Sequence, residues 1–259
     1  MAKGVDISEF QDDVDFDSLK AQVDFVFIRS SFGVGYTDNK FERNKTEARR
    51  VGLARGFYHY AYPQYNLPEE EASYFLSVLN DLQKDELMVL DFEESWNGNK
   101  VDWCFRFLKL IQNTLGFKPV LYINLNTANS ENWTTVVNGD FGLWIALWDN
   151  DSATAPTTSW PVVALKQYSS TGSIQGVNGS VDLDVFFGDL TLFKKYGYQP
   201  NNNKPSSTPI NIKLPVSNSQ EKSPPAYIVR RNSLNGFNLL DIFRSLLNLL
   251  LKFIGKTEI

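Results

Sequence analysis

Eight short runs rich in apolar and β-branched residues recur between residue 3 and residue 186, and this succession constrains the fold more than any other feature of the sequence. They comprise residues 3–8, 25–29, 55–62, 87–93, 119–123, 142–147, 161–168 and 181–186. The first five alternate with helical patterns, whereas the last three are joined by segments with little helical periodicity. Strands that alternate with helices form parallel sheets, and eight such strands close into a barrel. We therefore predict an α/β fold, an irregular TIM-like barrel with a degraded second half.

Three helices are predicted between the early strands. Residues 40–51 show helical periodicity. A second helix begins at Pro68, because proline suits the first helical turn and the three glutamates that follow suit the positive end of the helix dipole. A third has apolar residues spaced along 101–115 and ends at Gly116. These helices are expected to cover only part of the barrel.

The fourth strand ends in two acids, Asp91 and Glu93, within the run LMVLDFEES. Side chains two residues apart on a strand point to the same side, with Cα atoms roughly 6.5 Å apart. Both carboxyls can then address one bond, which is the acid/base arrangement for a glycosidic linkage. Glu94 is expected to face away and to serve as a control.

Two further acids are expected at the barrel mouth, where the C-terminal ends of parallel strands meet: Asp6 and Asp182. Each acid alone has an ordinary explanation, since Asp6 could cap a turn and Asp182 could belong to a loop. As a set they favour function, because clustered carboxylates repel one another and resist burial. Glu93 is the best general acid if it lies deeper among aromatic residues, with Asp91 as its ionised partner.

Composition excludes several classes of protein. The net charge of -5 and pI near 5.0 argue against a nucleic-acid-binding face. A single cysteine, Cys104, excludes an internal disulfide, and a single histidine, His59, leaves no histidine pair for zinc. Neither a metal nor another cofactor is expected, and a nucleophilic triad is unsupported.

Tyrosines alternate along the third strand, where Tyr58, Tyr60 and Tyr62 share one face. His59 falls on the opposite face and is predicted to be packed or hydrogen-bonded. Core filling explains most aromatic residues in any protein, so depth in the barrel decides which of them reach a substrate.

Seven motifs, in order, resemble the family 25 glycoside hydrolases, the Chalaropsis-type lysozymes found as bacterial or fungal muramidases and as phage endolysins. They are Gly4–Ser8 with Gln11, Phe27–Arg29, Gly56–Tyr60, Leu90–Glu93, Leu143–Ala146, Gln167–Tyr168 and Val181–Leu183. The resemblance implies an irregular barrel of eight strands and about five helices. It also implies hydrolysis, with retention, of the β-1,4 bond between N-acetylmuramic acid and N-acetylglucosamine in bacterial peptidoglycan.

The resemblance assigns the acid role to Glu93 and marks Asp6, Asp91 and Asp182 as the other acidic site residues. Either an aspartate or the N-acetyl group of the substrate could be the nucleophile. The residues expected to bind substrate are Arg29, Tyr58, Tyr60, Tyr122, Trp144 and Gln167. By the same resemblance, Trp148 is given lower weight than Trp144. The family usually has Asn two residues after the last Asp, where this chain has Asp184, which either tunes the site or binds solvent.

The composition changes near Tyr198, which ends the predicted catalytic domain, residues 1–198. Residues 199–226 are rich in Asn, Ser and Pro and indicate a linker. Residues 227–259 contain a predicted amphipathic helix whose charges disfavour a transmembrane span. This helix could fold back on the barrel, form an oligomer or lie on a membrane surface.

The sequence opens without an apolar signal segment. We therefore expect synthesis in the cytoplasm of a phage-infected bacterial host and action on the cell wall, as an endolysin. Two alternatives stay open: a chitinase-like hydrolase of N-acetylglucosamine polymers, and a non-catalytic wall-binding protein on the same scaffold.

Overall fold

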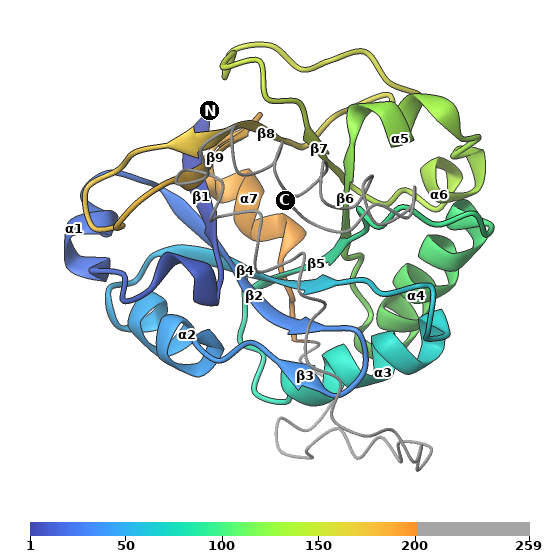
Figure 1. The fold of residues 1–259 in the computed structure, drawn as a ribbon, viewed down its shortest axis with the longest axis horizontal. Helices are drawn as coiled ribbons and strands as arrows, with labels where there is room; N and C mark the ends of the chain where they lie inside the picture. The colour runs from blue at the N-terminus through green and yellow to red at the C-terminus, as the bar shows by residue number, and fades with distance from the viewer. Residues whose placement is uncertain (201–259) are drawn as a thin grey trace, which may run out of the picture. The chain divides into compact units, whose positions relative to one another are not determined.

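The computed structural model describes residues 1–200, and eight of its strands close into a barrel (Figure 1). Around the ring these strands are β1 (Ala2–Ile7), β2 (Phe25–Phe32), β4 (Ala54–Tyr60), β5 (Leu87–Asp91), β6 (Val120–Asn124), β7 (Leu143–Ala146), β8 (Leu165–Gly172) and β9 (Val181–Phe186). The ring closes because β1 pairs with both β2 and β9. All eight predicted strands are confirmed. A short extra strand, β3 (Tyr36–Thr37), pairs with β2 outside the ring.

The last strand runs against the others. Neighbouring strands from β1 round to β8 are parallel, whereas β9 is antiparallel to both β8 and β1. Asp182 was expected at the C-terminal end of a parallel strand, and this expectation is wrong, because it is the second residue of β9. The reversed direction of β9 nevertheless places Asp182 at the same end of the barrel as the C-terminal ends of the other strands.

Seven α-helices and one 3-10 helix (Glu9–Gln11) occur in residues 1–200, against about five expected. They are α1 (Phe16–Lys20), α2 (Phe41–Arg50), α3 (Pro68–Val78), α4 (Lys100–Leu115), α5 (Leu125–Ser130), α6 (Thr134–Asn138) and α7 (Leu190–Tyr196). The three predicted helices are α2, α3 and α4, and Gly116 caps α4 with a left-handed φ of 79°. The additional helices span five to seven residues, too short to show a helical period.

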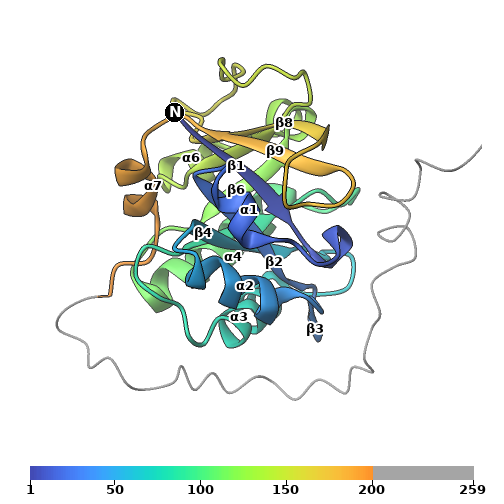
Figure 2. The ribbon, with the colours of Figure 1, turned by 90° about the vertical axis from the view of Figure 1, so that its left-hand side faces the viewer.

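Helices α2, α3 and α4 pack along one side of the barrel, while β8 and β9 lie on another side (Figure 2). No helix separates β7 from β8 or β8 from β9 in the described chain, as predicted. None of the helices in residues 1–200 is long and apolar enough to span a membrane. The predicted C-terminal helix and nearly all of the predicted linker lie outside the described residues.

Aromatic side chains fill the barrel interior. Phe27 stacks on Trp144 with ring centroids 4.4 Å apart, and Phe25 packs edge-on against Phe27. Glycines face these rings across the sheet: Gly4 is the register partner of Phe25, and Gly56 that of Phe27. A Cβ on either glycine would lie within 2.4 Å of a ring carbon. These two motif glycines therefore make room for the rings.

Helix α7 closes the end of the barrel where the parallel strands begin. Phe193, fully buried, stacks on Phe25 at 4.8 Å and meets Phe186 edge-on at 5.4 Å. The chain then runs on to Tyr198, whose N–H donates to the carbonyl of Glu86, just before β5. The acids lie at the opposite end of the barrel, where the parallel strands finish.

Candidate active site

The mouth of the barrel gathers the four predicted acids. Asp6 lies near the end of β1, Asp91 ends β5, and Glu93 follows two residues later. Asp182 lies opposite Asp6 in the register of β1 and β9. Burial raises the pKa of Tyr122 well above its usual value, and all four carboxylates act in the same direction. The structure therefore brings the four acids together around one tyrosine.

Gln167 joins the two sides of this acid cluster. Its Nε2 donates to Asp6 Oδ2 at 2.7 Å and to Asp182 Oδ2 at 3.3 Å. Its Oε1 accepts from the Tyr122 hydroxyl at 2.9 Å and from Trp148 Nε1 at 2.7 Å. Gln167 was predicted to bind substrate, but its amide is buried and used by these four bonds. We interpret it as a residue that positions the acids.

Asp184 lies beneath the cluster, fully buried. Its Oδ1 accepts a hydrogen bond from Trp144 Nε1 at 3.1 Å, and its carboxyl lies beside that of Asp6. Neighbouring buried carboxylates disfavour each other's ionisation. Burial, and then the charge of Asp184, raises the pKa of Asp6 well above its usual value. Burial, and then the charge of Asp182, does the same for the pKa of Asp184. Of the two roles considered for Asp184, the structure supports tuning of the site.

Two tryptophans, Trp144 and Trp148, differ in exposure from what was expected. Trp144 was placed in the substrate groove, yet it is 2% exposed and packs inside the barrel below the acids. Its contribution is the hydrogen bond to Asp184. Trp148 was given lower weight, yet it is 48% exposed and bonded to Gln167 at the mouth. An exposed aromatic ring beside the acids suits a sugar face better than a buried one does.

Glu94 does not face away from the site. Its Oε1 accepts a hydrogen bond from the Tyr60 hydroxyl at 2.7 Å, and its Oε2 one from Gln64 at 3.0 Å. Burial raises the pKa of Tyr60, and the carboxylates of Glu93 and Asp91 add to this shift. Tyr60 therefore lies beside the acids, and a contact with substrate stays a prediction. Glu94 is unsuitable as a control residue, because it is hydrogen-bonded to Tyr60.

Tyr58 also lies beside the acids, on the inner face of β4. It is 8% exposed. Burial raises the pKa of its hydroxyl, and the charges of Asp6 and Asp91 act in the same direction. Tyr58, Tyr60 and Tyr122 therefore stay neutral at ordinary pH and offer hydroxyl groups to the mouth.

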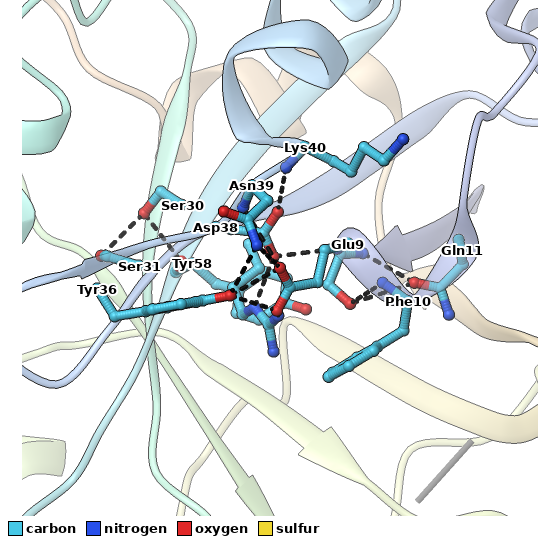
Figure 3. A network of polar contacts seen from close by, with 12 residues as sticks. Glu9, Phe10, Gln11, Ser30, Ser31, Tyr36, Asp38, Asn39, Lys40 and Tyr58 are labelled. Carbon is cyan, nitrogen blue, oxygen red and sulfur yellow. Dashed lines mark hydrogen bonds and ion pairs between the residues drawn. The ribbon is translucent and has the colours of Figure 1, made fainter. Parts of the chain in front are cut away.

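Arg29 is committed to partners within the protein. It is 4% exposed; its Nε donates to Asp38 Oδ2 and its Nη2 to Glu9 Oε1, both at 2.8 Å. Glu9 also accepts from the Tyr36 hydroxyl at 2.7 Å and from Asn39 at 2.8 Å, and Figure 3 shows these side chains converging on Glu9. Arg29 thus ties the segment after β1 to the segment after β2, and a contact with substrate stays a prediction.

His59 is fully buried behind the barrel wall. Its Nδ1 lies 2.8 Å from Ser31 Oγ and its Nε2 lies 2.9 Å from Glu71 Oε2. The imidazole also packs between Phe75 and Phe107. Ser31, His59 and Glu71 resemble a nucleophilic triad by type alone, because their burial keeps substrate away. The prediction of a packed, hydrogen-bonded histidine is confirmed.

A shallow cavity of about 450 Å³ lies at the other end of the barrel, near Lys84 and Asp85, which precede β5, and against α7. None of the predicted site residues lines it. The acid cluster rather than this cavity is the candidate active site.

Comparisons with known proteins identify the family of the chain. The family model of the glycosyl hydrolases family 25 matches residues 5–177. Lysozyme M1 of Streptomyces globisporus is 28% identical over 203 residues, which cover 72% of this chain and 68% of that protein. The autolytic lysozyme of Clostridium acetobutylicum is 32% identical over 188 residues, covering 71% of this chain and 55% of its own length.

Solved structures show the same barrel. A bacterial lysozyme from Streptomyces coelicolor superposes with a TM-score of 0.67 at 27% identity, covering 75% of this chain and 96% of that one. The catalytic domain of an endolysin from a Listeria monocytogenes bacteriophage gives a TM-score of 0.60 at 28% identity, covering 75% of this chain and 97% of that one.

An acid-lined mouth on a closed barrel of this topology defines the class of protein, a barrel glycoside hydrolase. More particularly, the chain belongs to the glycosyl hydrolases family 25. It is an enzyme of the lysozyme or muramidase type, and its substrate is peptidoglycan.

Proposed function

We propose that the enzyme cleaves the β-1,4 bond between N-acetylmuramic acid and N-acetylglucosamine with net retention, and that Glu93 is the general acid. The observation that carries this proposal is the placement of Asp91 and Glu93 at the end of β5. Both carboxylates contribute to the raised pKa of the buried Tyr122, so both lie close to its hydroxyl. Two carboxyls delivered from one strand to one point can serve the two halves of a glycosidic cleavage.

In the proposed mechanism Glu93 gives its proton to the departing sugar oxygen and then takes a proton from the water that completes hydrolysis. Net retention needs a group that bonds to the anomeric carbon as the leaving sugar departs: either an aspartate carboxylate such as Asp91, or the substrate's own N-acetyl oxygen oriented by Asp91, and the attacking water then displaces that group. Burial raises the pKa of Asp6 and of Asp184 well above the usual value, so together they carry less negative charge than two ionised carboxylates would. The hydroxyls of Tyr60 and Tyr122 donate to Glu94 and Gln167, so toward the substrate they can act only as acceptors.

Replacing Glu93 with Gln tests the acid assignment. The side chain keeps its size but loses the transferable proton, so we expect release of reducing ends from purified peptidoglycan to fall by about 10²–10⁴-fold. Unfolding by urea should be nearly unchanged. Glu47→Gln is the matched control, since Glu47 pairs with Arg50 at 2.9 Å near the end of α2, which leads into the start of β4 at the opposite end of the barrel, and it should keep full activity. Full activity in Glu93→Gln would sink the assignment.

Product analysis tests the bond and the stereochemistry. Mass spectrometry should find N-acetylmuramic acid at the new reducing end, whereas N-acetylglucosamine there would show a different specificity. NMR of the first product formed should show the β anomer. Turnover of chitin in preference to peptidoglycan would favour the chitinase-like alternative, and binding without any product would favour a non-catalytic wall protein.

A role as a phage endolysin is proposed on more general grounds. The similarity to the bacteriophage endolysin domain supports it. If this role is right, the enzyme should reach the cell wall of phage-infected cells only at the time of lysis.

A further inference from the structure

Two tyrosines form an exposed aromatic surface beside the mouth, which we name the tyrosine platform: Tyr62 and Tyr65. They lie in the turn between β4 and α3, with ring centroids 4.6 Å apart. Tyr65 is 63% exposed. Tyr62 packs on Phe32 at 4.8 Å, and Phe32 packs on Tyr60 at 5.4 Å. A continuous series of ring contacts thus connects Tyr60, which lies beside the acids, to the exposed Tyr65.

The platform is joined to the segment that carries the proposed general acid. Gln64, within the same turn, donates from Nε2 to Glu94 Oε2 at 3.0 Å and to the Ser95 carbonyl at 3.3 Å. The Tyr60 hydroxyl reaches the other oxygen of Glu94. Burial raises the pKa of Tyr62 to about 12, and Glu94 adds to the shift. The platform therefore forms one wall of the mouth, next to β5.

A buried carboxylate fixes the turn that carries the platform. Both oxygens of Glu71 accept from the Tyr62 N–H at 3.0 Å, and Oε1 also accepts from Asn66 Nδ2 at 2.8 Å. Glu71 is fully buried and contacts His59 on its other side. Trp103 Nε1 donates to the Asn66 carbonyl at 3.2 Å. Burying a carboxylate is unfavourable unless its hydrogen bonds are satisfied, as they are here, so this turn is rigidly held.

We propose that the tyrosine platform binds one sugar of the glycan strand at a distance from the bond that is cleaved. This inference rests on the proposed function, which places a glycan in the adjacent mouth. Sugar rings present flat apolar faces, and tyrosine offers a rigid aromatic face that loses little conformational entropy on binding. Because the turn is already held by Glu71, the platform meets the strand preformed.

Binding to the inactive variant Glu93→Gln tests the platform without hydrolysis. Isothermal titration with long, uncrosslinked glycan strands should show that adding Tyr65→Ala weakens binding about tenfold, whereas adding Tyr65→Phe leaves the affinity nearly unchanged. Leu67→Ala is the matched control, because Leu67 is apolar, 57% exposed and close in the same turn; it should leave affinity unchanged. If Tyr65→Ala binds the strands as tightly as its parent does, the proposal is overturned.

Kinetics in the otherwise unaltered enzyme separate this proposal from the proposed function. Tyr65→Ala should raise KM for long strands and leave kcat unchanged. For the shortest fragment that the enzyme cleaves, neither KM nor kcat should change. An equal loss on short and long substrates would also overturn the platform. If the proposed function fails, Glu93→Gln stays active or no muramic acid end appears, whatever the affinity of the Tyr65 variants.

Discussion

Gln167 shows what can be learned at the scale of a single residue. Trp148 Nε1 and the Tyr122 hydroxyl approach one end of its amide, and Trp148 can only donate, so that end must be the oxygen. The NH₂ group then faces Asp6 and Asp182. The orientation of the amide, and with it the spacing of two acids, follows from its neighbours.

The sequence predicted the acids but not this arrangement. Asp91 and Glu93 were found because their spacing of two residues on a strand is local information. Gln167 meets Asp6 across 161 residues of chain, and no local pattern reports such a contact. Trp144 and Trp148 could not be ranked, because only depth in the finished barrel separates a buried ring from an exposed one.

Asp184→Asn should stabilise the protein at neutral pH. Burial and Asp182 raise the folded-state pKa of Asp184, so its favourable contribution is complete below the unfolded pKa of about 3.9 and is lost as pH rises through the folded value. Asn can still accept from Trp144 and can donate to Asp6. We expect urea unfolding between about pH 4 and pH 8 to show a flatter pH dependence in this variant.

Asp149→Asn is a control of opposite sign. Asp149 pairs with the buried Lys166 at 2.8 Å, and despite some desolvation the hydrogen bond from Lys166 lowers its pKa. Its stabilising contribution is therefore present above the unfolded pKa and lost at acid pH. The Asp149→Asn variant should have a lower free energy of unfolding than the parent at neutral pH and the same free energy of unfolding in acid. Parallel curves for Asp184→Asn and its parent would contradict a raised pKa for Asp184 in the folded state.

At the scale of elements, strands were easier to place than to orient. Alternation identifies residues 181–186 as a strand, but a pattern of period two is the same in either direction, so nothing local shows that β9 is antiparallel. The short helices α5 and α6 were missed for a related reason, since five or six residues do not complete two turns. Both features depend on how the barrel closes.

Gly56→Ala should destabilise the pairing of β2 and β4. A Cβ there would lie 2.4 Å from the Phe27 ring and 2.9 Å from Leu87 Cβ, so the ring must move. We expect a loss of about 1–3 kcal/mol in the free energy of unfolding, measured by urea titration. Adding Phe27→Leu should make the double variant less costly than the sum of the two single ones. Simple additivity would exclude the ring as the cause.

At the scale of the whole molecule, the two ends of the barrel have different tasks. Phe193 on α7 fills the end where the parallel strands begin, while the acids occupy the end where they finish. The order of elements and the parallel ring could be predicted from the sequence. The plug could not, because a helix of seven residues with one inward phenylalanine has no distinctive pattern.

Phe193→Ala should separate stability from catalysis. Removing a fully buried ring leaves a cavity among Phe25 and Phe186, so we expect a loss of about 3–5 kcal/mol in unfolding free energy. Below the melting transition, kcat should be nearly unchanged. Leu192→Ala, next to it and 42% exposed, should alter stability by less than about 0.5 kcal/mol. A large fall in kcat for folded Phe193→Ala would show that the two ends are coupled.

The pairing of the first strand with the last also sets the order of events during folding. Strands β1 and β9 stand at opposite ends of the described sequence, and contacts so distant along the chain form late because a long loop must be closed first. Asp6 meets Gln167, Asp182 and Asp184 only when that pairing is made. We therefore expect the acid cluster to be completed last, so that a chain that has formed its helices and most of its strands still has no working site.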